Sequence, residues 1–556
     1  MQNDLVLDTW AGLDFKKRAV PTGSDTIVDW CGDQRRRLNA YTVLASYQEN
    51  VSRFFLDVGA DEEDVRDERR ELGDAQVIID TLLSSILGND VTITCEDEEL
   101  LKWAQKRGRQ WRIIRKLFQW EEKAIGLGDG VIAMWIDKPK GRVKVRVFDP
   151  ATYYPVLDGS SNEEFPKRVH IAWEFDRVDE ENHEVRYLRR MTWDLREVEG
   201  GGERCFYSDG EWLVQDLGIH EDYDNLLETR ARWYTNADGE ELHDIDLKVD
   251  YIPVVHLPNT QRDDDEHFGK SSLVTVAQIL DEIQATDSDL AKGASIAGFP
   301  PLAAEGALSE VDDRTGKVVE TYGPGTVFGG NLSTIDTSKS LDALLKYLDK
   351  LLARLAVNSH LPESVIGRVR PSEVPSGLAF ALGFAPLMAM VYRMRLVREE
   401  KYPLVFKFAY GLEKAAGISG LPEEPDEDTD WPTFKPGSFL PSDLEYVIKN
   451  VTNLLAARPR AISLETAVMM LIEAGLPIED AKEEVDRIRK TDFEAAETLV
   501  AATGDEREAY KYLGMQVPDD FEPPSQPHLG DDPITDDQHR GPRPGPSPDP
   551  VAPPLT

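Results

Sequence analysis

The stretch LPESVIGRVRPSEVPSGLAFALGF, residues 361–384, lies between two segments whose apolar residues recur at helical spacing. It carries Arg368 and Arg370 among several prolines and glycines. Because proline breaks a helix interior and glycine weakens one, we expect a loop between two long helices. The unusual feature of this loop is that an acidic chain places two cations on it.

The segment before the loop, KSLDALLKYLDKLLARLAV at 339–357, predicts a strongly amphipathic helix. Its leucines fall on one face: Leu341, Leu344, Leu345, Leu348, Leu351, Leu352 and Leu355. Lys346, Lys350 and Arg354 follow one another at intervals of four residues and therefore form a basic ridge along the helix. The segment after the loop, 377–416, predicts a third helix that Pro386 should kink.

Another long helix is expected upstream, at about 270–297. Apolar residues from Leu273 to Ala294 form one stripe, and the opposite face is acidic. At 1.5 Å per residue this helix would be roughly 40 Å long. Residues 299–338 separate it from the leucine-rich helix and contain strand-like runs such as KVVETYG, so they predict a small β-rich insert.

The N-terminal part of the chain predicts helices followed by strands. Apolar residues recur at helical spacing up to about residue 130, and from there to 257 the period becomes two. Two dipeptides in the second region, Asp209-Gly210 and Asp238-Gly239, are predicted hairpin turns. Helices packed on a mainly antiparallel sheet place the chain in the α+β class.

The C-terminal part predicts a linker, a helical bundle and a tail. Residues 421–441 are acidic, proline-rich and aperiodic, which is typical of a linker. Helical patterns resume at 442 and end near 513. From about 516 the sequence is rich in Pro and Asp and poor in apolar residues, so we expect it to be disordered.

Composition bounds the kind of protein. A chain of 556 residues is long enough for about two to four structural units. It has 63 Lys and Arg against 103 Asp and Glu, a formal charge of −40. Such a surface repels polyanions at long range, which argues against a protein that grips nucleic acid tightly over its whole surface.

Cysteine usage and hydropathy suggest where the protein works. Cys31, Cys95 and Cys205 are far apart and form no CxxC pair, so we expect buried or half-buried thiols in a reducing compartment. We see no signal peptide and no stretch of about 18 apolar residues that could span a membrane. The expected setting is the cytosol, without membrane attachment.

One motif suggests phosphate binding but does not fit it. Gly269-Lys270-Ser271 resembles the end of a phosphate-binding loop, but Asp264 stands where that loop needs a glycine. A carboxylate there would repel phosphate. In IGLGDGVIAM, a helix precedes the glycines and a strand follows, the reverse of a dinucleotide-binding loop, so a tight turn is expected.

Catalytic and metal motifs are not visible either. The acidic clusters EDEE at 96–99 and DDDE at 263–266 lack the spacing of a calcium loop, and we expect solvated loops or helix starts there. The 9 histidines include no HExxH, and the sequence has no GxSxG. We therefore predict no enzyme, no catalytic residue, no metal and no cofactor.

Four stretches in a fixed order carry a resemblance to a known family. They are RVFDPATYYPVLD (146–158), DYIPVVHLPNT (250–260), FGKSSLVTVAQILDEIQATDSDLAKGASIAGFPPL (268–302) and LPESVIGRVRPSEVPSGLAFALGFAPL (361–387). Together they resemble the portal proteins of tailed bacteriophages, of the type found in siphophages of actinobacteria. None of the four is a catalytic signature; the specificity lies in the ordered set.

The resemblance implies a portal-like α+β fold with a wing, a stem, a clip and a crown. The implied divisions are a wing at 1–268, stem helices at 269–298 and 339–360, a clip at 299–338, a tunnel loop at 361–376, a kinked wing helix at 377–420, a linker at 421–441, a helical crown at 442–515 and a disordered tail at 516–556.

The resemblance also implies a structural function. Portal proteins form a ring of about twelve copies at one capsid vertex, closed by head-to-tail contacts. Double-stranded DNA enters through this channel during packaging and leaves through it at ejection. The implied partners are other copies of the chain, DNA, the terminase large subunit, the major capsid and scaffold proteins, and a head–tail adaptor. The virion would be assembled in the host cytoplasm.

The resemblance implies that the cations of the loop and of the leucine-rich helix lie near DNA. Arg368 and Arg370 would lie on the tunnel loop, closest to DNA, and the ridge of Lys346, Lys350 and Arg354 would line the stem. A few cations can centre a duplex without trapping it. The alternative is that these cations pair with carboxylates of neighbouring subunits.

The alternative functions of the protein are a DNA-processing enzyme, either a packaging ATPase or a nuclease, and another structural head–tail connector or adaptor.

Overall fold

The structure is a computed structural model. It describes residues 30–50, 72–137, 142–157, 166–178, 182–199, 201–260, 267–298, 302–304, 332–334, 338–365, 383–425, 430–437, 444–457 and 461–513, except 219, 237, 364, 474, 475, 477 and 479. The elements are mixed α+β, as the sequence predicts. They separate into two compact units, Met1–Asp443 and Leu444–Thr556.

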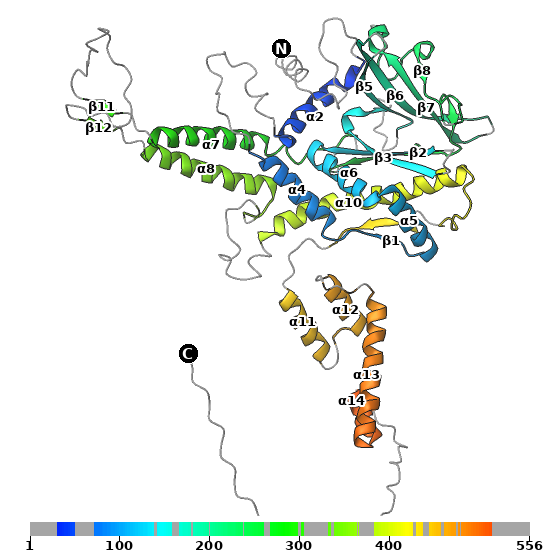
Figure 1. The fold of residues 1–556 in the computed structure, drawn as a ribbon, viewed down its shortest axis with the longest axis vertical. Helices are drawn as coiled ribbons and strands as arrows, with labels where there is room; N and C mark the ends of the chain where they lie inside the picture. Colours follow the sequence, from blue (N-terminus) through cyan, green and yellow to red (C-terminus); the bar gives the residue numbers. More distant parts are fainter. Residues whose placement is uncertain are drawn as a thin grey trace, which may run out of the picture. The chain divides into compact units, whose positions relative to one another are not determined.

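Two antiparallel sheets contain most of the strands described in the first unit (Figure 1). The smaller has the order β10-β2-β3, with β2 (Asp129–Asp137), β3 (Arg142–Phe148) and β10 (Val254–Pro258). The larger contains β4 (Tyr153–Val156), β5 (Arg168–Val178), β6 (Glu184–Glu197), β7 (Glu203–Leu213), β8 (Arg232–Trp233) and β9 (Ile245–Asp246). The predicted alternation holds in β3, where Val143 and Val145 are buried while Lys144 and Arg146 are exposed.

Five helices in the described residues of the first unit accompany these sheets. They are α2 (Arg35–Gln48), α4 (Asp74–Leu87), α5 (Glu98–Trp111), α6 (Ile113–Leu127) and α10 (Ala385–Ala415). The 3-10 helices in this part of the described chain cover Gly32–Gln34, Pro150–Thr152, Val214–Asp216 and Glu228–Arg230. The described residues of these elements form two apolar cores, and Trp120 and Phe406 are among the fully buried side chains of the larger one.

Gly128 makes the tight turn predicted between α6 and β2. Its φ of 103° is a conformation that favours glycine. A side chain there would also meet the backbone of Ser271, whose nitrogen would lie 2.9 Å from an added Cβ. Glycine therefore lets the chain after β10 pass close to the end of α6.

The helices α7 (Ala277–Gly298) and α8 (Ser338–Ser359) form a long antiparallel hairpin that extends away from the sheets (Figure 1). Each has 22 residues, about 33 Å at 1.5 Å per residue. Within the predicted insert 299–338, the described strands are β11 (Leu302–Ala304) and β12 (Leu332–Thr334), which pair antiparallel.

The second unit is helical in its described residues. It contains α11 (Leu444–Ala456), α12 (Leu464–Glu473), α13 (Ala481–Thr503) and α14 (Glu506–Tyr512). Asp480 caps α13 by accepting hydrogen bonds from the backbone N–H groups of Lys482 and Glu483. The predicted tail, 516–556, lies outside the described residues.

The predicted hairpin turn at Asp209-Gly210 is wrong. Both residues lie inside β7, where Asp209 is buried and pairs with Arg189 at 2.7 Å. Gly210 serves packing, because a Cβ there would lie 2.9 Å from the ring of Trp233. The turn predicted around Gly239 is confirmed: its φ is 82°, and the N–H of residue 236 donates to the carbonyl of residue 240 at 2.9 Å.

The predicted kink at Pro386 is also wrong. Helix α10 begins at Ala385, so Pro386 lies in its first turn, where a missing N–H removes no helical hydrogen bond. The proline inside α10 is Pro403. The predicted helix start near residue 270 is too early by several residues, since α7 begins at Ala277.

The predicted linker 421–441 is partly structured. Its residues Thr433–Lys435 form β13, which pairs antiparallel with β1 (Thr92–Thr94). Aromatic packing explains the difference: Phe434 lies 5.1 Å from the ring of Phe406, and Trp431 lies 5.2 Å from that of Tyr410. The packing of Trp431 and Phe434 therefore stabilises strand β13 inside a segment whose prolines had suggested a linker.

Candidate functional site

A buried ion pair fixes the long helix α10 against α6. The Arg398 guanidinium donates to both oxygens of Glu121, the shorter distance being 2.8 Å. It also donates to the backbone and side-chain oxygens of Asn259, just after β10. Tyr402 donates to the second Glu121 oxygen at 2.7 Å. Because Glu121 and Arg398 are almost fully buried, both charges depend on these partners.

A second buried carboxylate holds the segment that leads into α7. Asp129, at the start of β2, accepts hydrogen bonds from Tyr41 and from the backbone N–H of Gly269, the latter at 2.7 Å. His256 Nε2 lies 2.8 Å from the same carboxylate. Ser271 Oγ donates to the carbonyl of residue 126 at 2.7 Å. These bonds hold residues 269–272 on the end of α6 and explain why α7 begins only after them.

Contacts along α7 and α8 define their antiparallel register. Thr275 approaches the carbonyl of Asn358 at the base of the hairpin, at 3.4 Å. Tyr347 donates to Glu282 near the middle, at 3.1 Å. Near the far end, Gly293 allows close approach, because a Cβ there would lie 2.7 Å from Leu341. The hairpin is therefore a paired rod along its whole described length.

The predicted basic ridge exists on this rod. Lys346, Lys350 and Arg354 are all exposed on α8. None of them forms an ion pair with a carboxylate within the described part of the chain. Their charges are thus available to a ligand or to another molecule. Arg368 and Arg370, the predicted loop cations, lie outside the described residues.

Large apolar side chains are exposed on the hairpin and on α10. On α10 they form a row at intervals of four: Met388, Tyr392 and Leu396, which are 41%, 65% and 40% exposed. On α8, Leu345 is 50% exposed and Val357 is 73% exposed. The spacing along α10 was visible in the sequence, but which face is covered depends on tertiary packing. Rows of this kind mark surfaces that other molecules cover.

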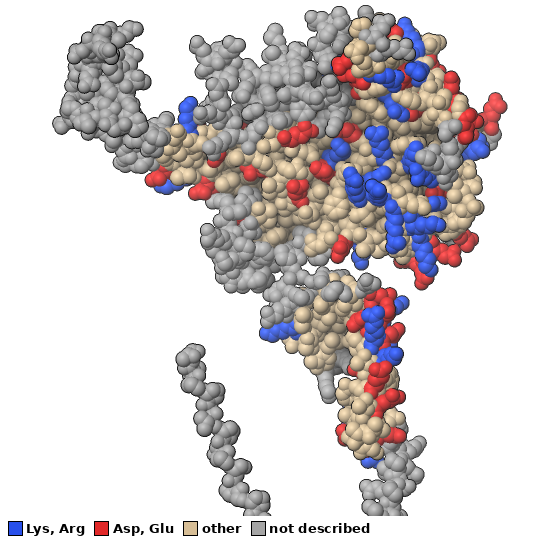
Figure 2. Space-filling view, viewed as in Figure 1, with Lys and Arg blue, Asp and Glu red and all other residues tan. Residues whose placement is uncertain are grey.

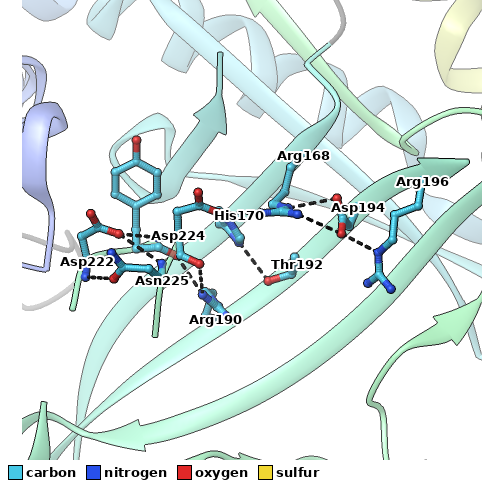
Figure 3. Close-up of polar contacts among 10 residues, drawn as sticks. Arg168, His170, Arg190, Thr192, Asp194, Arg196, Asp222, Asp224 and Asn225 are labelled. Atoms are coloured by element: carbon cyan, nitrogen blue, oxygen red, sulfur yellow. Dashed lines mark hydrogen bonds and ion pairs between the residues drawn. The ribbon is translucent and has the colours of Figure 1, made fainter. Parts of the chain in front are cut away.

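A hydroxyl, an imidazole and a carboxylate lie in line where the loop that carries Asp224 meets the larger sheet (Figure 3). His170 Nδ1 is 2.9 Å from Thr192 Oγ1, and His170 Nε2 is 3.1 Å from Asp224 Oδ1. Thr192 is the partner of His170 across the β5–β6 ladder. The chain of groups has the composition of a hydrolytic triad, so its protonation and exposure decide its role.

Protonation and exposure favour a structural role for this cluster. Burial lowers the pKa of His170 to about 4, far too low for an effective general base near neutral pH. Hydrogen bonds from His170 and then Arg168 hold the pKa of Asp224 below its usual range. His170 is 1% exposed. Arg190 donates to the carbonyls of residues 223 and 224, so the cluster ties this loop to the sheet.

The thiols match their predicted environment. Cys31 and Cys205 are buried, and Cys95 is half-buried. Burial raises the pKa of the Cys95 thiol. Neutral thiols are poor nucleophiles, so these cysteines act as small packing residues.

The described part of the chain offers neither a metal site nor a helix that could span a membrane. It contains no group of three or more His, Cys, Asp or Glu side chains arranged to hold a metal ion. None of its helices combines the length and apolarity that crossing a membrane requires. No protein family model matches the chain, and no curated protein matches it. The α7–α8 hairpin, with its exposed cations Lys346, Lys350 and Arg354, is the candidate functional element.

Proposed function

We propose that this protein is the portal protein of a tailed bacteriophage. It would form a ring at one capsid vertex, through which double-stranded DNA is packaged and later ejected. The observation that carries the proposal is the long α7–α8 hairpin, which extends from an α+β unit and bears the exposed ridge of Lys346, Lys350 and Arg354. The ordered sequence resemblance supports the same function.

Exposed apolar side chains support assembly into a ring. Met388, Tyr392 and Leu396 form a row on α10, and Leu345 and Val357 are exposed on α8. Covering them with a neighbouring copy would remove apolar area from water. A head-to-tail contact that closes on itself gives a ring, of about twelve copies in this proposal.

The charge distribution suits a channel that must release its cargo. Each phosphate neutralised by a cation adds salt-dependent affinity, and a ring multiplies the number of contacts. A net charge of −40 keeps general adhesion low. Three exposed cations per copy would centre a duplex in the channel. In the proposal Arg368 and Arg370 form the narrowest point.

The remaining partners follow from the proposed location. The β11–β12 end of the hairpin would face the terminase large subunit during packaging and the head–tail adaptor afterwards. The wing would contact the major capsid and scaffold proteins. The protein would have no catalytic role, and the virion would be assembled in the host cytoplasm.

The test is the mass of the purified chain at about 1 μM, a concentration at which a stable assembly persists. Mass photometry should show a species many times the 62.5 kDa of one chain. Tyr392→Lys with Leu396→Lys should shift the mass toward the monomer. Val178→Lys, at a residue 56% exposed on β5, is the matched control and should leave the assembly intact. A wild-type monomer, or hydrolysis of ATP or DNA by the pure chain, would contradict the proposal.

A further inference from the structure

A second group of cations gathers on one face of the first unit, away from the α8 ridge. Figure 2 shows Lys and Arg clustered over the region of α5, α6 and β3. We call its main members the basic face: Arg109, Arg112, Arg115, Lys116, Arg142 and Arg146. All are exposed except Lys116, which is half-buried. In a chain of charge −40, this is a marked segregation of charge.

The basic face is continuous because its three elements are hydrogen-bonded to one another. Trp111, at the end of α5, donates to the carbonyl of Val143 in β3 at 2.9 Å. Lys116, in the first turns of α6, donates to the carbonyl of Val145. Arg112 is the joint between α5 and α6, with a φ of 54°. The cations are therefore presented by a rigid part of the fold.

The charges of the basic face are not neutralised internally. None of its six cations pairs with a carboxylate in the residues that the structure describes, whereas cations at its margin do. Arg107, for example, pairs with Glu413 at 2.9 Å, and Lys123 pairs with Asp149 at 3.0 Å. Carboxylates therefore neutralise the cations at the edge of the basic face, whereas the six cations of the face itself keep their charge uncompensated among the described residues.

The cations of the basic face repel one another, as expected when no carboxylate of the described residues neutralises them. Burial lowers the pKa of Lys116, and the nearby charges of Arg146 and Arg115 lower it further. Burial likewise lowers the pKa of Arg146, with a contribution from Arg189. Like charges held together on a rigid surface would be relieved by a bound anion.

We propose that the basic face binds the phosphate backbone of double-stranded DNA, without reading its sequence. Five of the six cations are arginines, whose planar guanidinium groups match phosphate oxygens better than lysine does. The cations are spread over two helices and a strand, as suits an extended polyanion. This contact lies on different elements from the proposed channel and does not depend on it.

The composition of the face favours nucleic acid over an acidic protein. Protein interfaces are built around buried aromatic or apolar anchors, whereas DNA interfaces are far more positively charged. Phe118, at 38%, is the one large apolar side chain of α5, α6 and β3 among the described residues with marked exposure. An acidic surface of a second copy of the chain is the competing occupant, and the experiment separates the two.

The experiment measures binding of the full-length protein to a fluorescent duplex of about 30 base pairs at several salt concentrations. The variant Arg109→Gln/Arg115→Gln/Arg142→Gln should bind at least about tenfold more weakly, with the slope of log K against log salt reduced by about three. The lysine variant at the same three positions should keep most of the binding. It separates loss of charge from loss of folding.

A further variant completes the test. Lys482→Gln/Arg489→Gln/Lys490→Gln removes as many cations from exposed positions on α13 and should bind like wild type. The two proposals have different readouts, the mass of the assembly for the portal proposal and binding of the duplex for this one, so their failures are distinguishable. Equal binding by the Arg→Gln variant, or no wild-type binding at low salt, overturns the proposal. So does loss of assembly with DNA binding unchanged, which would assign the face to contacts between copies.

Discussion

Two sets of cations on long helices of the first unit differ in almost every respect. Arg398 on α10 is buried, and its guanidinium is shared by Glu121 and Asn259. Lys346 and Lys350 on α8 are exposed and form no ion pair with a described carboxylate. Taking an arginine out of water is costly, so a buried one must have partners in place. An exposed cation has no such need and remains available for binding.

We expect the buried charge of Arg398 to stabilise the fold and the exposed charges of α8 to bind other molecules. Removing the first kind should destabilise the protein without a specific effect on ligands. Removing the second kind should alter DNA binding with little effect on stability. Each of the following predictions tests one side of this division, beginning with the largest expected effect.

Arg398→Met should lower the free energy of unfolding by about 3–5 kcal/mol, because it leaves the carboxylate of Glu121 buried without its main partner. Lys350→Met is the matched control on an exposed helix face and should change stability by less than about 0.5 kcal/mol. Chemical denaturation of both variants measures the difference. Similar stabilities would show that the buried pair does not hold α10 on α6.

Acidification should destabilise the protein through His170. Burial lowers the folded-state pKa of His170 from 6.5 to about 4, so between these values the unfolded chain takes up a proton that the folded chain refuses. Stability contributed by neutral His170 is present above pH 6.5 and is lost as the pH falls toward 4, by up to about 3 kcal/mol. Thermal melts at pH 7 and pH 5 should differ less for His170→Gln than for wild type. Equal differences would show that His170 is not the titrating group.

Asp129→Asn should lower stability by about 2 kcal/mol. The carboxylate accepts from Tyr41, from His256 and from the N–H of Gly269, and an amide cannot satisfy all three donors. The loss of stability should be local to the base of α7, so amide hydrogen exchange of the backbone around residue 269 should accelerate. Exchange that rises uniformly over the chain would contradict a local anchor.

Neutralising the α8 ridge should have the smallest effect on stability and a clear effect on function. The variant Lys346→Gln/Lys350→Gln/Arg354→Gln should unfold within about 0.5 kcal/mol of wild type, because all three side chains are exposed. Its assembly should be unchanged, while DNA held inside the assembly should be released at lower salt. Unchanged retention would show that the ridge does not contact DNA.

The hairpin could be predicted from the sequence because its signal is local. Leucines at helical spacing placed the second helix at 339–357, and the structure has Ser338–Ser359. The alternation of apolar and basic residues likewise predicted strand β3 correctly. Such patterns work when one face of an element is buried and the other is solvated, since periodicity then records burial directly.

The failures have tertiary causes. Asp209-Gly210 has the composition of a turn, but a buried arginine partner and the ring of Trp233 hold it inside β7. Nothing local in 433–435 indicates a strand, because its partner is more than 300 residues away, at 92–94. The basic face was missed for a related reason. Its cations come from separate segments, and the net charge of −40 conceals their clustering.

The most direct test of the central claim is the structure of the assembled protein by electron cryo-microscopy. The portal account predicts a closed ring with an axial opening, with the α7–α8 hairpins arranged around it and Lys346, Lys350 and Arg354 facing the opening. A particle without a central opening, or a ring with the hairpins on its outer flank, would contradict the account.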